Sequence, residues 1–408
     1  MKVAFIIHFR ELWEKTDVTY SPDGEEVSYG QDKTFFYREG PFAGEDTVLT
    51  LPNIPMLVST CNKSSVKVHS KTRYFQTSLA LMKLKPFKTK EHNDILIAST
   101  QGMLEADDDP HVSKPFVQIK VGEILWGVDS KMLTASKRLL KLWNRTDLLF
   151  PHDEFGIFVG KNGTNPGIMT AKTGINEQYN DIGRLIYFDQ KPKLDFWKNE
   201  GECNDIKGTD GSSFPLGILP TTTLYLFNRD LCRSIPLVWQ ENVTSSGVPG
   251  FRFVPPKNIF SPPEENPDNE CFCMADGKCN VPKGVFNMSA CQYGSPIMMS
   301  WPHFFQADLE LLKTVDGLKP DKNKHQFFMD IQPKLGVALK AQARSQINVQ
   351  MYKMEEELEE RVKEAKGLRD MIFPVLWFES GIDGINDPHT LELLQTAIYM
   401  PEKAKQAM

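Results

Sequence analysis

The chain has 408 residues, 40% of them hydrophobic and 25% charged, so it is long enough to bury a sizeable core. Its net charge of −6 argues against a general nucleic-acid binder, because such proteins are basic. No run of 18 apolar residues occurs, so no segment of this sequence can cross a bilayer as a helix. The first residues, MKVAFIIHFREL, contain too short an apolar stretch for a signal peptide, which by itself favours a cytosolic protein.

The first 60 residues predict short strands joined by hairpins. Apolar and polar runs alternate there and are interrupted by turn residues, as in TYSPDGEEVSYG. The SPDG stretch predicts a turn, because Pro22 fixes its own φ angle and Gly24 tolerates a positive one.

A basic segment follows, from Lys63 to Lys90, with eight Lys and Arg residues and no Asp or Glu. Because the whole chain carries −6, the remaining residues carry −14, so positive charge is concentrated here. Phe75, Leu79 and Met82 recur at helical spacing, which predicts an amphipathic helix. A solvated helix face would account for this pattern, but such a charge asymmetry also attracts anionic partners.

The rest of the chain predicts a mainly β fold. Residues 92–114 are acidic and irregular and indicate an insertion, and 115–143 predict a strand followed by a helix. Between 144 and 345 short β-like runs alternate with Gly, Pro, Asn and Asp turns, which favours an antiparallel barrel or sandwich. Residues 351–369 predict a charged surface helix, and MIFPVLWF at 371–378 predicts a last buried strand.

Glycosylation sequons argue against the cytosolic interpretation. Chance would produce two or three in a chain of this length, but the sequence contains five, at Asn62, Asn144, Asn162, Asn242 and Asn287. If they are used, the chain resides in a glycosylating compartment, and the segment that directs it there lies outside these residues.

The seven cysteines pose a choice between a metal site and disulfides. Four of them form the pattern C-x-C-x₅-C-x₁₁-C, which fits zinc knuckles poorly and contains no His. Six cysteines could form three bridges in fifteen pairings and leave Cys61 over. Together with the sequons, this pattern favours an oxidising compartment. The six are Cys203, Cys232, Cys271, Cys273, Cys279 and Cys291.

No catalytic constellation is apparent in the sequence. There is no G-x-S-x-G elbow, H-E-x-x-H pair or Walker loop. Asp210 and Ser212 in GTDGSSFP indicate a turn, and His303 in SWPHFF is most simply a core histidine. We therefore interpret the chain as a binding protein, not an enzyme, with no cofactor and no metal.

Several long motifs occur in an order that resembles a known family. They are GTDGSSFP, DLCRSIPLVW, GFRFVPP, ENPDNECFC, CQYGSPIMMSWPHFFQAD and HQFFMDIQPKLG. This series strongly resembles the class B scavenger receptors, which include the fatty-acid translocase, the high-density-lipoprotein receptor and the lysosomal integral membrane protein. The sequences KHQFFMDIQPKLG and FPVLWFESGID are most similar to those of the insect epithelial membrane protein branch. The likeness runs from about Trp13 to about Ile398 and is thin across 60–115.

The resemblance implies an α+β, mainly β fold. A large antiparallel β-barrel would contain a lipid tunnel and carry a helical apex, formed here by about residues 60–143. Residues 1–408 would be a single ectodomain, whose transmembrane helices and first strands lie outside the chain. By position, the implied disulfides are Cys203–Cys271, Cys232–Cys291 and Cys273–Cys279.

The resemblance also implies a function. The basic apex would bind lipoproteins, anionic phospholipids or fatty acids, and the tunnel would pass fatty acids or sterols towards the membrane. The alternative is a lysosomal sorting receptor that binds a hydrolase, a protein ligand, at the apex; no nucleic-acid partner is expected. The expected location is the plasma or lysosomal membrane, with this region extracellular or luminal. An inserted segment at 88–113 departs from the family pattern beside the apex. The expected ligand-binding cations are Lys71, Arg73, Lys83, Lys85, Lys88 and Lys114, the last of which is nearest to the family's tunnel-mouth lysine.

Overall fold

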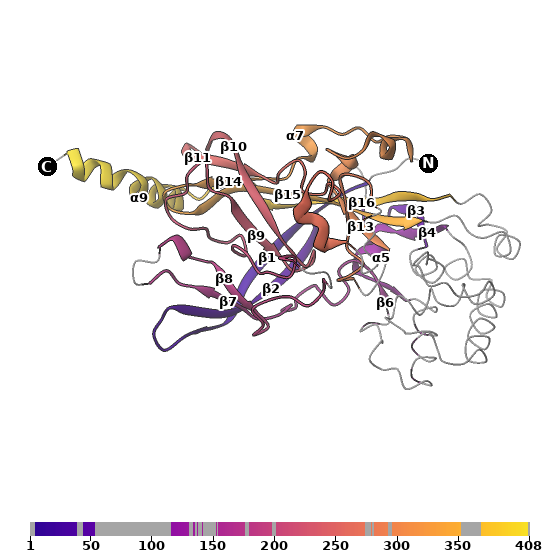
Figure 1. The fold of residues 1–408 in the computed structure, drawn as a ribbon, viewed down its shortest axis with the longest axis horizontal. Coiled ribbons are helices and arrows are strands. Elements are labelled where there is room, and N and C mark those ends of the chain that lie inside the picture. The colour runs from indigo at the N-terminus through magenta and orange to yellow at the C-terminus, as the bar shows by residue number, and fades with distance from the viewer. Residues whose placement is uncertain are drawn as a thin grey trace, which may run out of the picture.

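The computed structural model describes residues 5–38, 44–53, 116–129, 152, 154–175, 179–197, 201–273, 279, 281–292, 296–351 and 369–406, with single positions at 134, 137 and 141. The described part is mainly β, as the sequence predicts. Most of its strands form one large sheet, and helix α9 (Pro388–Gln406) projects from one end of it (Figure 1). None of the helices in these ranges is long and apolar enough to cross a bilayer.

Ten strands follow one another across the large sheet in the order β8-β7-β2-β1-β16-β15-β14-β11-β10-β9, and β12 and β13 join it through β15. Neighbours run antiparallel, except that β1 and β16 are parallel. The fully antiparallel sheet expected from the sequence is therefore wrong at one pair. The bounds are β1 (Phe5–Tyr20), β2 (Glu26–Arg38), β7 (Met169–Lys172), β8 (Leu185–Phe188), β9 (Leu224–Asn228), β10 (Arg233–Ser245), β11 (Val248–Val254), β12 (Val285–Asn287), β13 (Ile297–Ser300), β14 (Phe328–Gln332), β15 (Val337–Met351) and β16 (Met371–Ile382).

Smaller elements complete the described part. Two short two-stranded sheets pair β3 (Val48–Pro52) with β4 (Phe116–Lys120) and β5 (Val128–Asp129) with β6 (Glu154–Phe155). Helix α5 (Val121–Trp126) follows β4 directly, which confirms a strand followed by a helix at the start of the predicted 115–143 region, whereas most of 130–143 lies outside the described residues. The other helical segments are α7 (Lys322–His325) and the 3₁₀ turns η2 (Tyr179–Asp181), η3 (Pro267–Phe272), η4 (Pro302–Phe304) and η5 (Leu309–Lys313).

The predicted SPDG turn joins the first two strands. The backbone N–H of Gly24 donates to Ser21 O at 2.9 Å, and Gly24 has a φ of 72°, which glycine adopts without strain. The strands on either side, 16 and 13 residues long, are longer than the short strands that the sequence suggested. They stay long because the ladder between β1 and β2 continues through an irregularity between Thr16 and Thr19.

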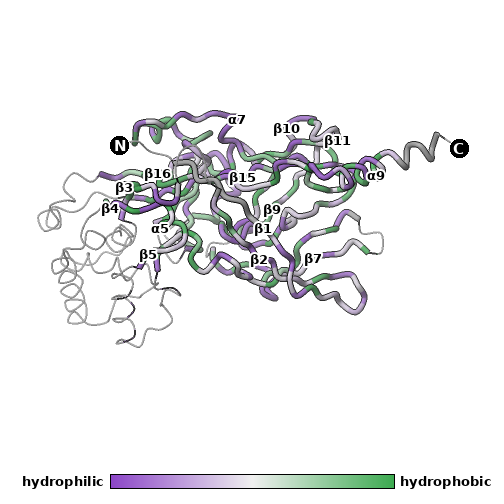
Figure 2. The backbone as a smooth tube through the Cα atoms, turned by 180° about the vertical axis from the view of Figure 1, so that it is seen from behind, coloured by the Kyte–Doolittle hydropathy of each residue, from purple (hydrophilic) through white to green (hydrophobic). Residues whose placement is uncertain are grey.

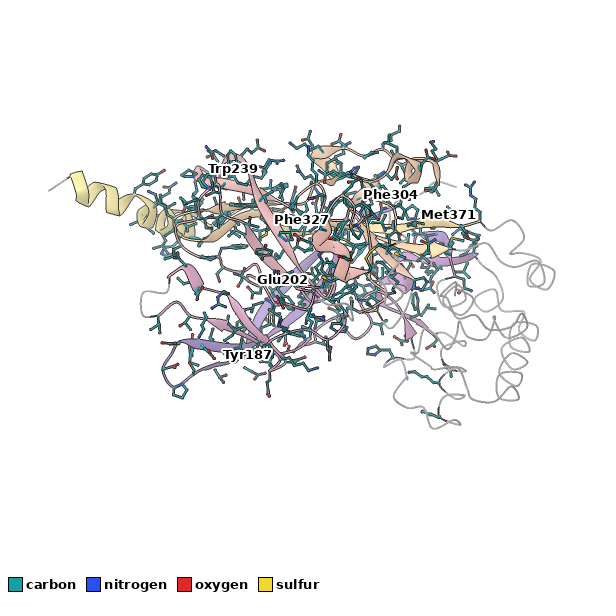
Figure 3. The ribbon with its side chains drawn as sticks, viewed as in Figure 1. Tyr187, Glu202, Trp239, Phe304, Phe327 and Met371 are labelled. Carbon is teal, nitrogen blue, oxygen red and sulfur yellow. A yellow bond between two sulfur atoms is a disulfide. The ribbon has the colours of Figure 1, made fainter. Side chains whose placement is uncertain are left out.

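The core consists chiefly of two hydrophobic clusters. The larger contains Tyr29, Phe253 and Trp301, and the smaller surrounds Phe35 and the β3–β4 pair. Hydrophilic and hydrophobic stretches alternate along the chain in Figure 2. Figure 3 shows Phe327, which is 8% exposed, in the middle of the molecule. The predicted buried strand at 371–378 is confirmed as the first part of β16.

A closed barrel is not found among the described strands, because β8 and β9, at the two ends of the path, do not pair with each other. A short segment connects them instead. The N–H of Leu185 on β8 donates to Gly208 O at 2.8 Å, and the N–H of Thr209 donates to Tyr225 O on β9 at 3.0 Å. Gly208 has a φ of 79°, and a Cβ there would lie 1.9 Å from Tyr225 O. The expected barrel core is therefore unconfirmed: the path of described strands is open, and hydrogen bonds through Gly208 and Thr209 link its two end strands.

Candidate functional site

The core-facing side of the β1–β2 hairpin carries polar and aromatic side chains that stay partly exposed. In the ladder, Trp13 lies opposite Lys33 and Lys15 lies opposite Gln31, so these four side chains share one face. Gln31 is 2% exposed on that face, whereas Trp13 is 42% exposed. A core-facing surface with an accessible Trp indicates that solvent reaches this side of the sheet.

Lys15 lies in a network centred on a buried carboxylate. Its Nζ is 3.6 Å from Asp210 Oδ2, 3.1 Å from Ser212 Oγ and 4.1 Å from the ring centroid of Tyr29. Asp210 is 6% exposed and also accepts hydrogen bonds from Tyr29 Oη at 2.9 Å and Gln31 Nε2 at 3.3 Å. Burial, together with the charge of Asp210, raises the pKa of Tyr29, so its phenol keeps the proton that it donates.

This network gives the GTDGSSFP motif a second role. The predicted turn is confirmed, because Asp210 Oδ1 accepts from both the N–H and the Oγ of Ser212, at 2.9 and 2.6 Å. The other carboxylate oxygen of Asp210 binds the first hairpin, which the sequence analysis did not foresee. Only the folded chain brings residues 29 and 210 together.

A second cation lies over an aromatic ring on the same face. Lys33 Nζ is 4.6 Å from the ring centroid of Trp13. Partial burial of Asp230, whose side chain is 40% exposed, would raise its pKa, but the charges of Lys161 and Lys33 outweigh this effect and lower the pKa to about 2. The face therefore presents ammonium groups beside apolar rings, a combination suited to an amphiphile with an anionic head.

The cysteine cluster forms disulfides, and two of the three expected bridges are confirmed. Cys203 is bonded to Cys271, with Cα atoms 5.8 Å apart, and Cys273 is bonded to Cys279, with Cα atoms 4.8 Å apart. Within the described ranges, no group of three or more His, Cys, Asp or Glu residues is placed to hold a metal ion.

The third expected bridge, Cys232–Cys291, is not formed in this structure and is corrected to two thiols. Each sulfur has a backbone acceptor, Arg229 O at 3.3 Å for Cys232 and Asp230 O at 3.7 Å for Cys291. A hydrogen bond between the two side chains, together with burial, raises the pKa of Cys232, so its thiol stays protonated.

The expected ligand-binding cations Lys71, Arg73, Lys83, Lys85, Lys88 and Lys114 all lie outside the described residues, as do Cys61, Asn62 and Asn144. Their roles stay predictions. The other three sequon asparagines are described: Asn162 and Asn242 are exposed, and Asn287 is half-buried. Asn242 lies within β10, opposite Phe251, rather than in the turn that its flanking residues suggested.

His303, expected from the sequence to be a core histidine, is only partly buried, and its Nδ1 accepts from the N–H of Lys319 at 3.1 Å. Sequence reasoning missed two features. His303 stacks on His325, and Arg233 is buried beside a pocket. The signal for Arg233 was present, since DLCRSIPLVW places an Arg inside an otherwise apolar strand, but the motif served only to establish the resemblance.

Comparison with known proteins agrees with the resemblance. A family model described as the CD36 family matches residues 7–408. This chain belongs to the CD36 family. It is 31% identical over 377 residues to Lysosome membrane protein 2 of Homo sapiens, covering 92% of this chain and 68% of that protein. It is 28% identical over 372 residues to Scavenger receptor class B member 1 of Mus musculus, covering 91% of this chain and 64% of that protein.

Membership of the CD36 family confirms the class B scavenger receptor resemblance. The names of these relatives denote a lysosomal membrane protein and a scavenger receptor, in agreement with the expected plasma or lysosomal membrane location.

Proposed function

We propose that this chain is the extracellular or luminal part of a scavenger receptor that binds lipids or lipoproteins and conducts acyl chains along the core-facing side of its sheet. The observation that carries the proposal is the face of the β1–β2 hairpin with exposed Trp13 and partly exposed Lys15. The family membership and the names of the relatives support the receptor class.

The chemistry of this face suits fatty acids. An acyl chain gains about 0.8 kcal/mol for each methylene that it buries, so rings such as Trp13 favour the tail. The ammonium groups of Lys15 and Lys33 can attract a carboxylate head, and neither is buried deeply enough to lose its hydration. No bond in the lipid has to change, so transfer down a gradient needs no catalyst.

The link between the ends of the sheet supports an enclosed path. The Gly208–Thr209 segment joins β8 to β9, and side-chain bonds from Asp210 tie the same loop to β2. We propose that this loop closes the sheet around the lipid path as the barrel of the family. Capture at the basic segment 63–90 would then deliver lipid to the path.

Quenching of tryptophan fluorescence by a spin-labelled stearate tests the proposal. The expected result is saturable quenching that Trp13→Phe reduces. Trp126→Phe is the matched control, because Trp126 lies on α5 and its Nε1 donates to Glu45 Oε1 at 2.8 Å. Equal quenching in the wild type and in Trp13→Phe would show that fatty acids do not lie along the hairpin.

A further inference from the structure

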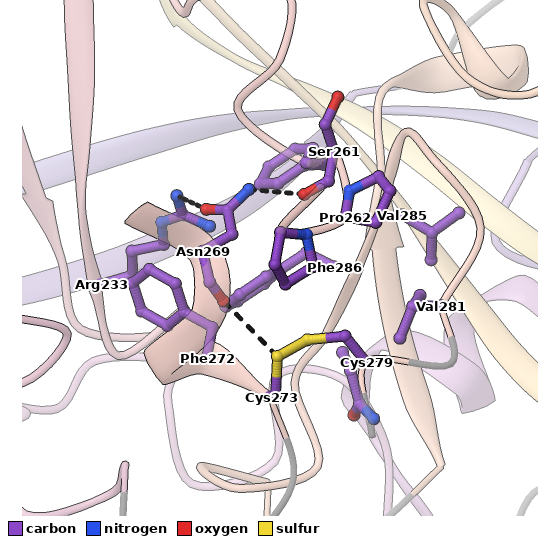
Figure 4. Close-up of a pocket in the computed structure, with 13 residues that line it drawn as sticks. Arg233, Ser261, Pro262, Asn269, Phe272, Cys273, Cys279, Val281, Val285 and Phe286 are labelled. Atoms are coloured by element: carbon purple, nitrogen blue, oxygen red, sulfur yellow. Dashed lines mark hydrogen bonds between the residues drawn. A yellow bond between two sulfur atoms is a disulfide. The ribbon is translucent and has the colours of Figure 1, made fainter. Parts of the chain in front are cut away.

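Arg233 is a buried cation at the start of β10, with 5% of its surface exposed. It lines a pocket with about 50 Å³ of accessible space, beside the Cys273–Cys279 bridge (Figure 4). The pocket is separate from the core-facing surface of the β1–β2 hairpin, since no residue of β1 or β2 lines it.

Among the described residues, the guanidinium of Arg233 finds hydrogen-bond acceptors for only some of its N–H groups. Nη2 donates to Asn269 Oδ1 at 2.9 Å and to Ile259 O at 3.3 Å. The Cζ atom lies 4.0 Å from the ring centroid of Phe272 and 5.1 Å from that of Phe286. Nε is buried and has no hydrogen-bond partner among the described residues.

No carboxylate forms an ion pair with Arg233 in the described part of the chain. Burial lowers the pKa of Arg233 to about 9, and the charge of Asp268 opposes this only through space. The group is nevertheless mostly protonated at neutral pH. A buried charge without a counter-charge is costly, and the aromatic rings offset that cost without accepting a hydrogen bond from Nε.

The adjacent side chain cannot supply the missing charge. Asn269 uses its amide to donate to Ser261 O at 2.7 Å and to Ile259 O at 3.1 Å. A carboxylate at this position would face both carbonyl oxygens and repel them. Glu265, which does not line the pocket, is already paired with Lys283 and accepts from Ser261 Oγ.

The remaining wall of the pocket is mostly apolar and includes Pro262, Val281, Val285 and Phe286. In Figure 4, Arg233 lies on one side of the residues that line the pocket, and Val281 and Val285 lie on the other side. A ligand that matches this arrangement carries one negative charge at one end and a short apolar tail at the other.

We propose that this pocket binds a small monocarboxylate, with its carboxylate against Arg233 and its tail against Val281 and Val285. The ligand supplies a counter-charge that no described residue provides through an ion pair. This site is independent of the lipid path proposed above, so either can fail without the other.

The test uses hexanoate as the probe and the folded, secreted chain. Saturation-transfer NMR should show contact between hexanoate and the protein, and the melting temperature should rise more in sodium hexanoate than in sodium chloride at equal ionic strength. Arg233→Met should weaken hexanoate binding at least about tenfold. Lys283→Met, which removes a cation that does not line the pocket, should leave binding unchanged. An absence of saturation transfer in the wild type, or equal binding by Arg233→Met, would overturn the proposal.

A second pair of variants covers the case in which Arg233→Met does not fold. Val281→Glu places a tethered carboxylate in the pocket wall, and Val281→Gln is its neutral control. We expect Val281→Glu to melt higher than Val281→Gln and to lose the response to hexanoate. Retained hexanoate binding in Val281→Glu, with the same affinity as in Val281→Gln, would show that the probe binds elsewhere.

Discussion

His303 and His325 lie face to face, with ring centroids 4.4 Å apart and planes inclined by 11°. Each accepts a backbone N–H at Nδ1, from Lys319 at 3.1 Å and from Asp321 at 2.9 Å respectively. The ring of Trp377 lies steeply inclined to both, with its centroid 6.3 Å from that of His303 and 5.6 Å from that of His325. Nδ1 can accept only when it carries no proton, so this arrangement requires both rings to be neutral.

The pair should make stability depend on pH. Burial, with His303 and Arg344 nearby, lowers the pKa of His325 to about 4, although Asp321 opposes the shift; burial also lowers the pKa of His303. The unfolded chain therefore binds protons at a higher pH than the folded chain. Stability should fall as the pH drops from about 6.5 to about 4, with His325 contributing a loss of about 3 kcal/mol.

Denaturant unfolding across this pH range checks the prediction. His325→Gln should flatten the pH dependence, because glutamine can still accept a hydrogen bond but does not titrate. His389→Gln, which changes an exposed histidine on α9, should retain the wild-type slope. An unchanged slope in His325→Gln would rule out the stacked pair as its source.

The basic segment should control the capture of anionic particles. Changing Lys83, Lys85 and Lys88 to Glu alters the local charge by six units and should largely abolish binding to anionic vesicles. Wild-type binding should weaken steeply with salt, because the Debye length shrinks from about 10 Å at 0.1 M to about 3 Å at 1 M. The measurement is vesicle affinity across a salt series.

A control with the same change in net charge makes this test specific. Lys257, Lys319 and Lys322 are exposed, and their replacement by Glu should reduce vesicle affinity much less. If both triple variants bind equally, net charge and not the basic segment governs capture. Deletion of residues 92–113 should strengthen binding if their acidic side chains mask the segment.

Asn162 combines a sequon with a structural hydrogen bond. Its Oδ1 accepts from the N–H of Phe35 at 2.8 Å, which ties the GKNGTNPG turn to β2. A glycan attaches through the amide nitrogen, so glycosylation leaves this oxygen free to accept. We expect Asn162 to carry a glycan, and both Asn162→Asp and Asn162→Ala to lose one glycan by mass.

The two Asn162 variants should differ in stability. Asn162→Asp keeps the acceptor for Phe35, whereas Asn162→Ala removes it and should be less stable by about 1 kcal/mol. The comparison is made between the two variants after enzymatic deglycosylation, with thermal unfolding as the readout. Equal stability would mean that the hydrogen bond does not hold the turn.

The two disulfides should contribute unequally. Cys203–Cys271 has a sequence separation of 68, and Cys273–Cys279 one of 6. From the chain entropy of the closed loops, replacing the first pair by Ser should cost about 4 kcal/mol and replacing the second about 2 kcal/mol. Equilibrium unfolding of the two double-serine variants measures both values. A larger loss from the short loop would contradict the entropic explanation.

The sequence by itself determined the local features of this protein. The SPDG turn, the strand and helix after residue 115 and the buried strand at 371 follow from residue types a few positions apart, and local geometry decides such features. The ordered motifs were specific enough to identify the family and, through it, the Cys203–Cys271 pair.

Only the tertiary structure decided which distant groups meet. Nothing near Asp210 in the sequence predicts that its carboxylate binds Tyr29, and nothing near His303 predicts a stacked partner at residue 325. The parallel pairing of β1 with β16 likewise brings together the first and the last described strands, which are far apart in the sequence. These contacts depend on the order of strands in the sheet, and burial then sets the charge states of groups such as Arg233 and His325. The spacing of residues in the sequence predicts neither the strand order nor these charge states, because the packing of the whole core determines which strands pair.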